Sequence, residues 1–306
     1  GGWMMSKIKE SRNKFKGVIV PMLTPFDENG DLNVDALRML TEWLIEQGVH
    51  GLFPVSSIGE AAKLSMEEKR TVIKTVVDAA NGRVPVIPGT GFPDVKRTLQ
   101  LTKFAQDVGA DAALIVEPYY QKPSAEALYD YYKTINDCVE DFPLVLYNIP
   151  PFAGYELTPE LVVKCADLEN VVAIKDSGGD MGKFNFMLYM AGMKIAVLQG
   201  IDLLLLTSLV IGSPGGMVGG ANVAAKMEVE MYNAFIEGNL EKARRIHDKL
   251  VPLWHALGGY GTFPVAYKEA VTMMGIPVGP ARKPAEPLKE AEKMRLKEIL
   301  QKCGLL

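Results

Sequence analysis

The sequence predicts an α/β protein, a closed (β/α)8 barrel followed by a C-terminal helical extension. Three observations support this prediction. Short apolar, β-rich runs alternate with segments of helical periodicity, eight such runs occur in series, and the pattern after the eighth run is wholly helical. Eight strand–helix units in series favour a closed parallel barrel over an open doubly wound sheet.

The eight predicted strands lie between segments with helical spacing of apolar residues. They are Gly17–Met22, Gly51–Val55, Val84–Pro88, Ala112–Val116, Leu144–Tyr147, Val171–Lys175, Ile195–Gln199 and Gly216–Gly220. Typical start signals mark the helices between them. Val34–Gln47 has apolar residues at helical spacing, and Ser65 precedes an acidic first turn. Thr158 is followed by Pro159, a proline at the first helical position.

The predicted organisation has three parts: an N-terminal tail at 1–16, the barrel at 17–238, and a helical extension of the same unit at 239–306. The last barrel helix is predicted at Ala224–Glu237. The helices predicted for the extension are Leu240–Leu257, Phe263–Met274 and Leu288–Gln301. Gly1–Met5 lacks the features of a signal peptide, and its duplicated methionine suggests an expression scar ahead of a native start.

Composition argues against several classes of function. The net charge of -4 gives no general attraction for nucleic acid or anionic lipid. The apolar run Leu203–Ile211 is too short to span a bilayer, so neither nucleic-acid binding nor membrane insertion is expected. The histidines are too few and scattered for a metal site. The cysteines lack metal-ligand spacing, so free buried thiols in the cytoplasm are expected. They are Cys138, Cys165 and Cys303.

Lys175 is the most informative residue, because it ends the apolar run Val171–Lys175. Burial disfavours the lysine cation and frees the lone pair that attacks a ketone. Taken alone, the residue favours the simpler interpretation, an ordinary lysine that reaches from a strand end to water. The residues at other predicted strand ends favour the nucleophile instead. Active sites of such barrels lie at the carboxyl ends of the strands, and Ser56–Ser57, Tyr119–Tyr120 and Tyr147 occupy these positions.

A lysine imine to an α-keto acid acts as an electron sink, so a carbon–carbon bond β to the imine carbon can break or form through an enamine. This chemistry needs a proton shuttle. Tyr147, Ser57 and a tyrosine such as Tyr120 could supply a relay of hydroxyl groups. The alternatives are that Tyr147 only packs in the barrel and that Ser57 only caps a helix or forms a turn.

Backbone N–H groups just before a predicted helix would hold the carboxylate of the keto acid without an arginine. These groups belong to the loop Ser56, Ser57, Ile58 and Gly59. Glu60 is expected to brace this loop or a helix start rather than to transfer protons. Neither a metal nor a separate cofactor is expected, since the covalent imine itself supplies the electron sink.

With these motifs in order, the sequence resembles the class I pyruvate-dependent aldolase family that includes dihydrodipicolinate synthase, N-acetylneuraminate lyase and 2-keto-3-deoxygluconate aldolase. The resemblance extends from about Gly17 to the C-terminal helices. The segments that carry it are Val20–Phe26, Ser56–Glu60, Pro118–Tyr120, Tyr147–Pro150 and Ile174–Asp176.

This resemblance implies a role for each of four residues. Lys175 corresponds to the Schiff-base lysine, Tyr147 to the proton-transfer tyrosine and Ser57 to the relay hydroxyl. Tyr120 corresponds to a relay tyrosine that family members contribute across a subunit interface. The resemblance therefore also implies a homotetramer built from dimers, with pyruvate and an aldehyde as small-molecule partners.

Departures from the family pattern bear on the second substrate. Where dihydrodipicolinate synthases carry an arginine for a carboxylate, this chain has Phe152 within Pro150–Gly154. Asp202 stands alone where sialic acid lyases have an acidic pair, and Gly219 replaces a serine of their eighth-strand motif. Ile58 replaces the family's second loop hydroxyl, so the carboxylate of pyruvate would depend more on backbone N–H groups.

The expected function is therefore a lyase that reversibly cleaves a 2-keto-3-deoxy sugar acid, such as 2-keto-3-deoxygluconate, to pyruvate and an aldehyde. Alternatives within the enzyme class are dihydrodipicolinate synthase, another hydroxy-oxo-acid aldolase and a keto-deoxyglucarate dehydratase. A non-catalytic pyruvate-binding barrel is the alternative from another class. The presence of both Lys175 and Tyr147 argues against it.

Overall fold

The structure is a computed structural model that describes residues 6–306. The expected expression scar at Gly1–Met5 lies outside the described residues. The chain forms two compact units: the first contains the chain up to Gly17 and Pro85–Met217, and the second contains Val18–Val84 and Val218–Leu306. In the described part of the chain, no helix is long and apolar enough to cross a membrane.

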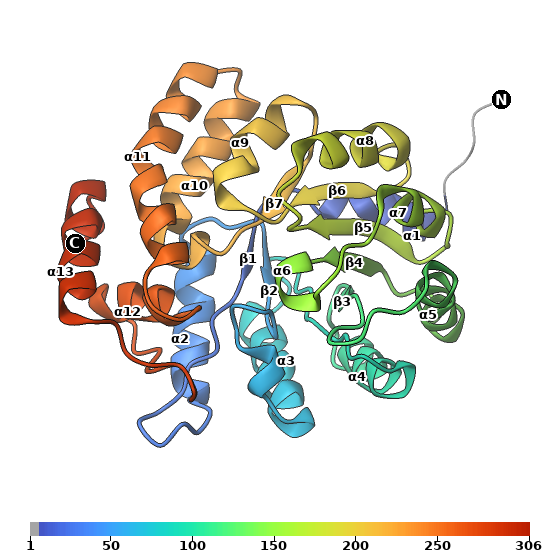
Figure 1. The fold of residues 1–306 in the computed structure, drawn as a ribbon, viewed down its shortest axis with the longest axis horizontal. Helices are drawn as coiled ribbons and strands as arrows, with labels where there is room; N and C mark the ends of the chain where they lie inside the picture. Colours follow the sequence, from blue (N-terminus) through green and yellow to red (C-terminus); the bar gives the residue numbers. More distant parts are fainter. Residues whose placement is uncertain (1–5) are drawn as a thin grey trace. The chain divides into compact units, whose positions relative to one another are not determined.

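The first unit is built on a parallel sheet with the strand order β7-β6-β5-β4-β3. The strands are β3 (Ala113–Val116), β4 (Leu144–Asn148), β5 (Val171–Asp176), β6 (Ala196–Gln199) and β7 (Gly215–Met217). The register places Val116 beside Tyr147 and Tyr147 beside Lys175. Figure 1 shows β4, β5 and β6 side by side.

Helices follow the strands of the first unit and pack against the sheet. Contacts join α4 to β3, α8 to β6, and α9 to both β6 and β7. The helices are α1 (Lys7–Glu10), α4 (Val95–Asp107), α5 (Ala125–Cys138), α6 (Pro150–Ala153), α7 (Pro159–Cys165), α8 (Met181–Ala191) and α9 (Asp202–Val210), with a 3-10 turn η1 (Ser11–Lys14). Thr158 caps α7 through its side chain, and Pro159 takes the first position, as the sequence predicts.

Within the predicted N-terminal tail, α1 contacts β5. Lys9 Nζ donates to the carbonyl oxygens of Ala166, Leu168 and Val171 at 2.8, 2.6 and 2.6 Å. These carbonyls lie between the end of α7 and the start of β5. Lys9 therefore ties the N-terminal segment to the entry of the strand that carries Lys175.

The second unit contains a parallel strand pair and the C-terminal helices. Strand β1 (Gly17–Pro21, whose first residue belongs to the first unit) pairs with β2 (Gly51–Phe53), and Pro21 lies opposite Phe53. The helices are α2 (Val34–Glu46), α3 (Met66–Ala80), α10 (Ala221–Ile236), α11 (Leu240–Gly259), α12 (Val265–Met273) and α13 (Glu290–Cys303), with a 3-10 turn η2 (Ala61–Lys63). Ser65 caps α3 in a capping box with Glu68, in agreement with its predicted start.

One predicted strand is wrong. Val84–Pro88 is not a strand, and residues 6–306 contain seven strands instead of the predicted eight. This segment still follows β3, because Asp111 N–H donates to Val86 O and Leu114 N–H donates to Pro88 O. Pro85 and Pro88 have no N–H to donate, so a regular ladder cannot form. The parallel α/β class is confirmed, whereas barrel closure and the boundary at 238 stay predictions.

The predicted burial of all three cysteines is correct only for two of them. The thiols of Cys165 and Cys303 are buried, but Cys138 is exposed. Cys138 is the last residue of α5, where the amphipathic pattern of the helix no longer constrains which side faces the sheet.

Candidate active site

Lys175 and Tyr147 form the centre of the candidate site. Each lies one residue before the end of its strand, and the parallel register places the two directly side by side. Lys175 Nζ is 3.1 Å from Tyr147 Oη and 4.4 Å from the centroid of the tyrosine ring. Both residues are almost fully buried, at 3% and 2% exposure. The sequence prediction that these two residues meet is confirmed.

A row of four buried polar side chains lies one residue further along the same strands. Asn148 is paired with Asp176, and Asp176 with Gln199, in the strand register. Glu117 follows β3 at the same level, since its N–H donates to Tyr147 O at 3.2 Å. All four residues are at most 3% exposed. Because side chains alternate across a strand, this row lies on the face of the sheet opposite to Tyr147 and Lys175.

The two acids of this row are held by neutral hydrogen-bond donors. Asn148 Nδ2 donates to Asp176 Oδ1 at 2.7 Å, and the N–H of Ile149 donates to Glu117 Oε1 at 2.7 Å. Desolvation raises the pKa of Glu117 to about 8. Desolvation also raises the pKa of Asp176, against the opposing effect of its hydrogen bonds from Asn148 and Gly178.

Sequence reasoning did not find this row. The available signal was a polar residue directly after the last inward-facing position of each of four consecutive strands: Val116-Glu117, Tyr147-Asn148, Lys175-Asp176 and Leu198-Gln199. The sequence alone suggests solvent-exposed loop starts at these positions. Because these four side chains are buried, they support the strand ends behind the site instead.

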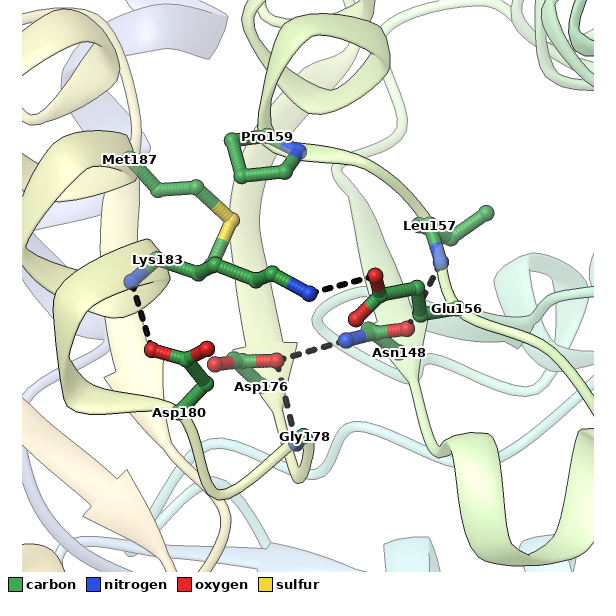
Figure 2. Close-up of a pocket in the computed structure, with 9 residues that line it drawn as sticks. All are labelled: Asn148, Glu156, Leu157, Pro159, Asp176, Gly178, Asp180, Lys183 and Met187. Atoms are coloured by element: carbon green, nitrogen blue, oxygen red, sulfur yellow. Dashed lines mark hydrogen bonds and ion pairs between the residues drawn. The ribbon is translucent and has the colours of Figure 1, made fainter.

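Figure 2 shows the small cavity beside Asn148 and Asp176. Its volume is about 10 Å³, which is room for at most one water molecule. Lys183 Nζ contacts Glu156 Oε1 at 2.5 Å across it, and Asn148 Oδ1 accepts the N–H of Leu157 at 2.8 Å (Figure 2). The cavity is too small for a sugar acid, and it belongs to the support of β4 and β5 rather than to a substrate pocket.

The loop Ser56–Gly59 belongs to the second unit and has a strained backbone at both ends. Val55 and Glu60, which flank the loop, have φ values of 57° and 58°, a region that residues other than glycine seldom adopt and β-branched residues such as Val55 least of all. Ser56 Oγ donates to Met22 O at 3.0 Å and accepts the N–H of Gly59 at 3.0 Å. Strain of this kind persists where the surroundings fix the backbone, and it is common in functional loops.

Glu60 braces this loop, as the sequence predicts. Its Oε1 is 3.0 Å from Lys268 Nζ, and its Oε2 is 3.2 Å from Lys63 Nζ. The N–H of Arg282 also donates to Oε2, at 2.9 Å. The pair of Glu60 and Lys268 is almost fully buried. Removal of either residue would therefore leave the other charge buried without its partner.

Two further predicted site residues meet in the second unit. A Cβ added to Gly219 would lie 3.0 Å from Ile58 Cδ1, so the two residues pack directly against each other. Ile58 is buried, and Ser57 is partly exposed beside it. A Cβ on Gly59 would lie only 2.6 Å from Met22 O, so this position requires glycine.

The remaining predicted site residues lie nearer to the surface of the first unit. Tyr120 is 92% exposed and has a φ of 79°. Phe152 lies in the single turn of α6 and is 52% exposed, and Asp202 is the partly exposed first residue of α9. Within residues 6–306, no cluster of three histidine, cysteine, aspartate or glutamate residues could hold a metal ion.

Comparisons with known proteins show the family of this chain. Residues 14–303 match the model of the Dihydrodipicolinate synthetase family. A 4-hydroxy-tetrahydrodipicolinate synthase of Methanothrix thermoacetophila is 38% identical over 95% of this chain and 97% of its own length. A DapA-like lyase of Pyrobaculum aerophilum, itself uncharacterized, is 38% identical over 96% of this chain and 100% of its own length.

A solved structure is similar over the same range. The chloride-inhibited dihydrodipicolinate synthase from Acinetobacter baumannii, complexed with pyruvate, has 36% sequence identity and a TM-score of 0.91. The match covers 95% of this chain and 99% of that one.

Fold, site and comparisons together define a class I pyruvate-dependent aldolase, a carbon–carbon lyase. The chain belongs to the Dihydrodipicolinate synthetase family. Members of this family form a lysine Schiff base with pyruvate and need no metal cofactor.

Proposed function

We propose that this protein is a Schiff-base lyase that reversibly cleaves a 2-keto-3-deoxy sugar acid, such as 2-keto-3-deoxygluconate, to pyruvate and an aldehyde. The observation that supports its chemistry best is the 3.1 Å contact between Lys175 Nζ and Tyr147 Oη inside a buried site. An amine and a phenol at this distance can exchange a proton directly.

In the cleavage direction, the amine of Lys175 attacks the keto carbon, and the hydroxyl of the carbinolamine leaves as water with a proton donated by Tyr147, which gives the protonated imine. The Tyr147 phenolate then accepts the proton of the substrate hydroxyl as the carbon–carbon bond breaks. The bonding electrons move into the protonated imine and give an enamine, and the aldehyde departs. Protonation of the enamine carbon and hydrolysis of the imine then release pyruvate. Ser57 and Tyr120 are proposed to complete the proton relay.

The loop Ser56–Gly59 is proposed to bind the carboxylate of pyruvate. Among its backbone donors, Gly59 N–H already donates to Ser56 Oγ. The N–H of Ile58 makes no hydrogen bond to residues 6–306 and is therefore the donor best suited to the carboxylate. Gly219 leaves the space that the Ile58 side chain fills.

The proposed preference for an uncharged aldehyde rests on Phe152 and on the distribution of arginine. The chain has no arginine between residues 98 and 243, a stretch that contains β3 to β7 and every loop between them. A substrate carboxylate near Phe152 would lose water without gaining a guanidinium partner, which costs several kcal/mol. Asp202, at the start of α9, would bind hydroxyl groups of a polyol chain instead.

A second candidate is 4-hydroxy-tetrahydrodipicolinate synthase, the name carried by relatives that are 37% to 39% identical to this chain. The two candidates share pyruvate and the imine and differ only in the aldehyde. They are separated by kcat/KM for condensation of pyruvate with glyceraldehyde and with aspartate semialdehyde.

We expect glyceraldehyde to be preferred by orders of magnitude, since several kcal/mol separate a satisfied from an unsatisfied carboxylate. Phe152→Arg should shift the ratio towards aspartate semialdehyde, whereas the apolar control Phe152→Leu should leave the ratio unchanged. Preference of the unmodified protein for aspartate semialdehyde would replace the sugar-acid proposal with the synthase.

We also propose that the chain closes into a (β/α)8 barrel and assembles into a homotetramer. Tyr120 supports the assembly, because a tyrosine with positive φ and 92% exposure suits a side chain whose contacts lie on another subunit. Several large apolar side chains on and next to α8 and α9 are also exposed, as expected for a surface that a second copy covers. They are Phe186, Tyr189, Met190, Met193 and Val210.

A further inference from the structure

We propose that Glu117 is a positioning residue for proton transfer: its fully buried carboxyl fixes the strand end that carries Tyr147. This inference rests on the proton-transfer role proposed for Tyr147. Nothing in the proposed reaction uses Glu117 directly, and its side chain lies behind the site rather than in it.

The backbone geometry shows how Glu117 acts on Tyr147. In a parallel ladder, a residue donates its N–H to one strand neighbour and accepts, through its C=O, the N–H two residues further along. Glu117 N–H donates to Tyr147 O at 3.2 Å, as this pattern requires. The next bond differs, because Ile149 N–H donates to the side-chain Oε1 of Glu117 at 2.7 Å. The carboxyl thus replaces a backbone carbonyl and holds Asn148 from both sides.

The chain turns away at this point, which explains why a side chain is needed. Pro118 follows Glu117, and its carbonyl accepts the hydroxyl of Tyr155 at 2.5 Å. On the other strand, Ile149 has a φ of -138° and a ψ of 73° and leads into α6. Neither backbone continues the ladder, so the bond from Ile149 N–H to the Glu117 carboxyl takes the place of the next ladder bond between the ends of β3 and β4.

The surroundings of Glu117 favour the neutral acid. The residue is 0% exposed, and in the described part of the chain its Oε2 has no hydrogen-bond partner and no cation forms an ion pair with it. The titratable groups that face it are Asp176 from β5, Tyr132 from α5 and Tyr155 from the segment after α6. All of these are neutral or negative, so none would stabilise a carboxylate.

This arrangement predicts a pH dependence with a definite sign. Below its pKa of about 8, Glu117 is protonated and keeps the carboxyl end of β4 in place. Above that pH, the Glu117 carboxyl loses its proton and becomes a negative charge without a buried partner. The end of β4 is then expected to rearrange so that this charge reaches water. Proton transfer by Tyr147 should therefore slow as the pH rises through about 8.

The test measures exchange of the C3 protons of pyruvate for deuterium by proton NMR, from pH 6 to 10, without any aldehyde. The variants are Glu117→Gln, which keeps an acceptor for Ile149 N–H and cannot ionise, and Glu117→Leu, which removes the acceptor. The exposed Glu140→Gln, in the same unit, is the matched control. Borohydride trapping of the pyruvate imine on each variant reports imine formation separately.

We expect Glu117→Gln to retain most of the exchange at pH 7 and to lose the decline near pH 8. Glu117→Leu should exchange about 100-fold more slowly at every pH, the cost of a displaced catalytic group, while it still traps pyruvate. An unchanged pH profile in Glu117→Gln would overturn the inference. Absence of exchange and trapping in the wild type would instead overturn the proposed pyruvate chemistry, so the two failures are distinguishable.

Discussion

Tyr147 lies between two groups that define its proposed role. The amine of Lys175 contacts its hydroxyl, and its backbone accepts a hydrogen bond from Glu117, whose carboxyl is buried. The first contact places the phenol beside the amine proposed to form the imine, where the proton transfer is proposed to occur. The second holds the strand end from which the phenol projects. Chemistry and positioning are thus assigned to residues on opposite faces of the same sheet.

Tyr147→Phe should lower turnover by about 100- to 10,000-fold, which is the usual contribution of a positioned acid–base group. The fold should survive, because only a hydroxyl is removed. Steady-state kinetics with pyruvate and glyceraldehyde measure the loss, and Tyr129→Phe, at a partly exposed tyrosine of α5, is the control. Turnover near the wild-type value in Tyr147→Phe would reject the proton-shuttle role.

The sequence was sufficient to predict the pairing of Lys175 and Tyr147. Both end apolar runs, and consecutive strands of a parallel sheet are usually neighbours. The sequence was not sufficient for Glu117 and Asp176, because a charged residue after a strand is normally solvated. Only the helices packed behind the sheet make these positions buried. The place of Ser57 relative to Tyr147 stays a prediction, since the two residues belong to different units.

At the scale of elements, periodicity and capping located the helices well. The predicted helix at Val34–Gln47 is α2, and the predicted start at Ala224 coincides with a kink of α10, where φ is -114° and ψ is 36°. The error at Val84–Pro88 arose because β-rich composition was given more weight than the missing N–H groups of two prolines. An apolar composition indicates that a segment is buried, whereas a strand also needs backbone N–H groups to donate the hydrogen bonds of the sheet.

The short helix α1 should contribute to stability through one side chain, Lys9. Burial lowers the pKa of Lys9 to about 8, whereas its three carbonyl acceptors favour the ammonium form, because only that form has three N–H donors. Lys9→Met leaves these acceptors without their shared donor and should lower the free energy of unfolding by about 1–3 kcal/mol.

Urea denaturation followed by circular dichroism measures this loss, with the exposed Lys7→Met on the same helix as the matched control. The control should change the stability by less than about 0.5 kcal/mol. Equal stability of the two variants would show that the bonds of Lys9 do not hold the N-terminal segment.

At the scale of the whole molecule, the residues proposed to act in catalysis come from both compact units. Lys175, Tyr147 and Tyr120 belong to the first unit, and Ser57 and Ile58 to the second. The proposed catalyst therefore requires the whole chain, and the proposed role of Tyr120 requires a second chain as well.

Mixing inactive Lys175→Ala with inactive Tyr120→Phe subunits should restore part of the activity. In a hybrid assembly, one site then has an intact Lys175 from one chain and an intact Tyr120 from the other. The matched control mixes Lys175→Ala with Tyr147→Phe, which leaves every site defective because both groups come from one chain. If mixed subunits remain inactive after exchange is verified by mass spectrometry, Tyr120 does not act across an interface.

The central claim is that Lys175 forms the imine with pyruvate, and borohydride reduction tests it most directly. Sodium borohydride with pyruvate should inactivate the protein and add one reduced pyruvate to the peptide that contains Lys175, as read by mass spectrometry after digestion. Protein treated with borohydride alone should remain active. An adduct on another lysine, or no adduct at all, would contradict the account.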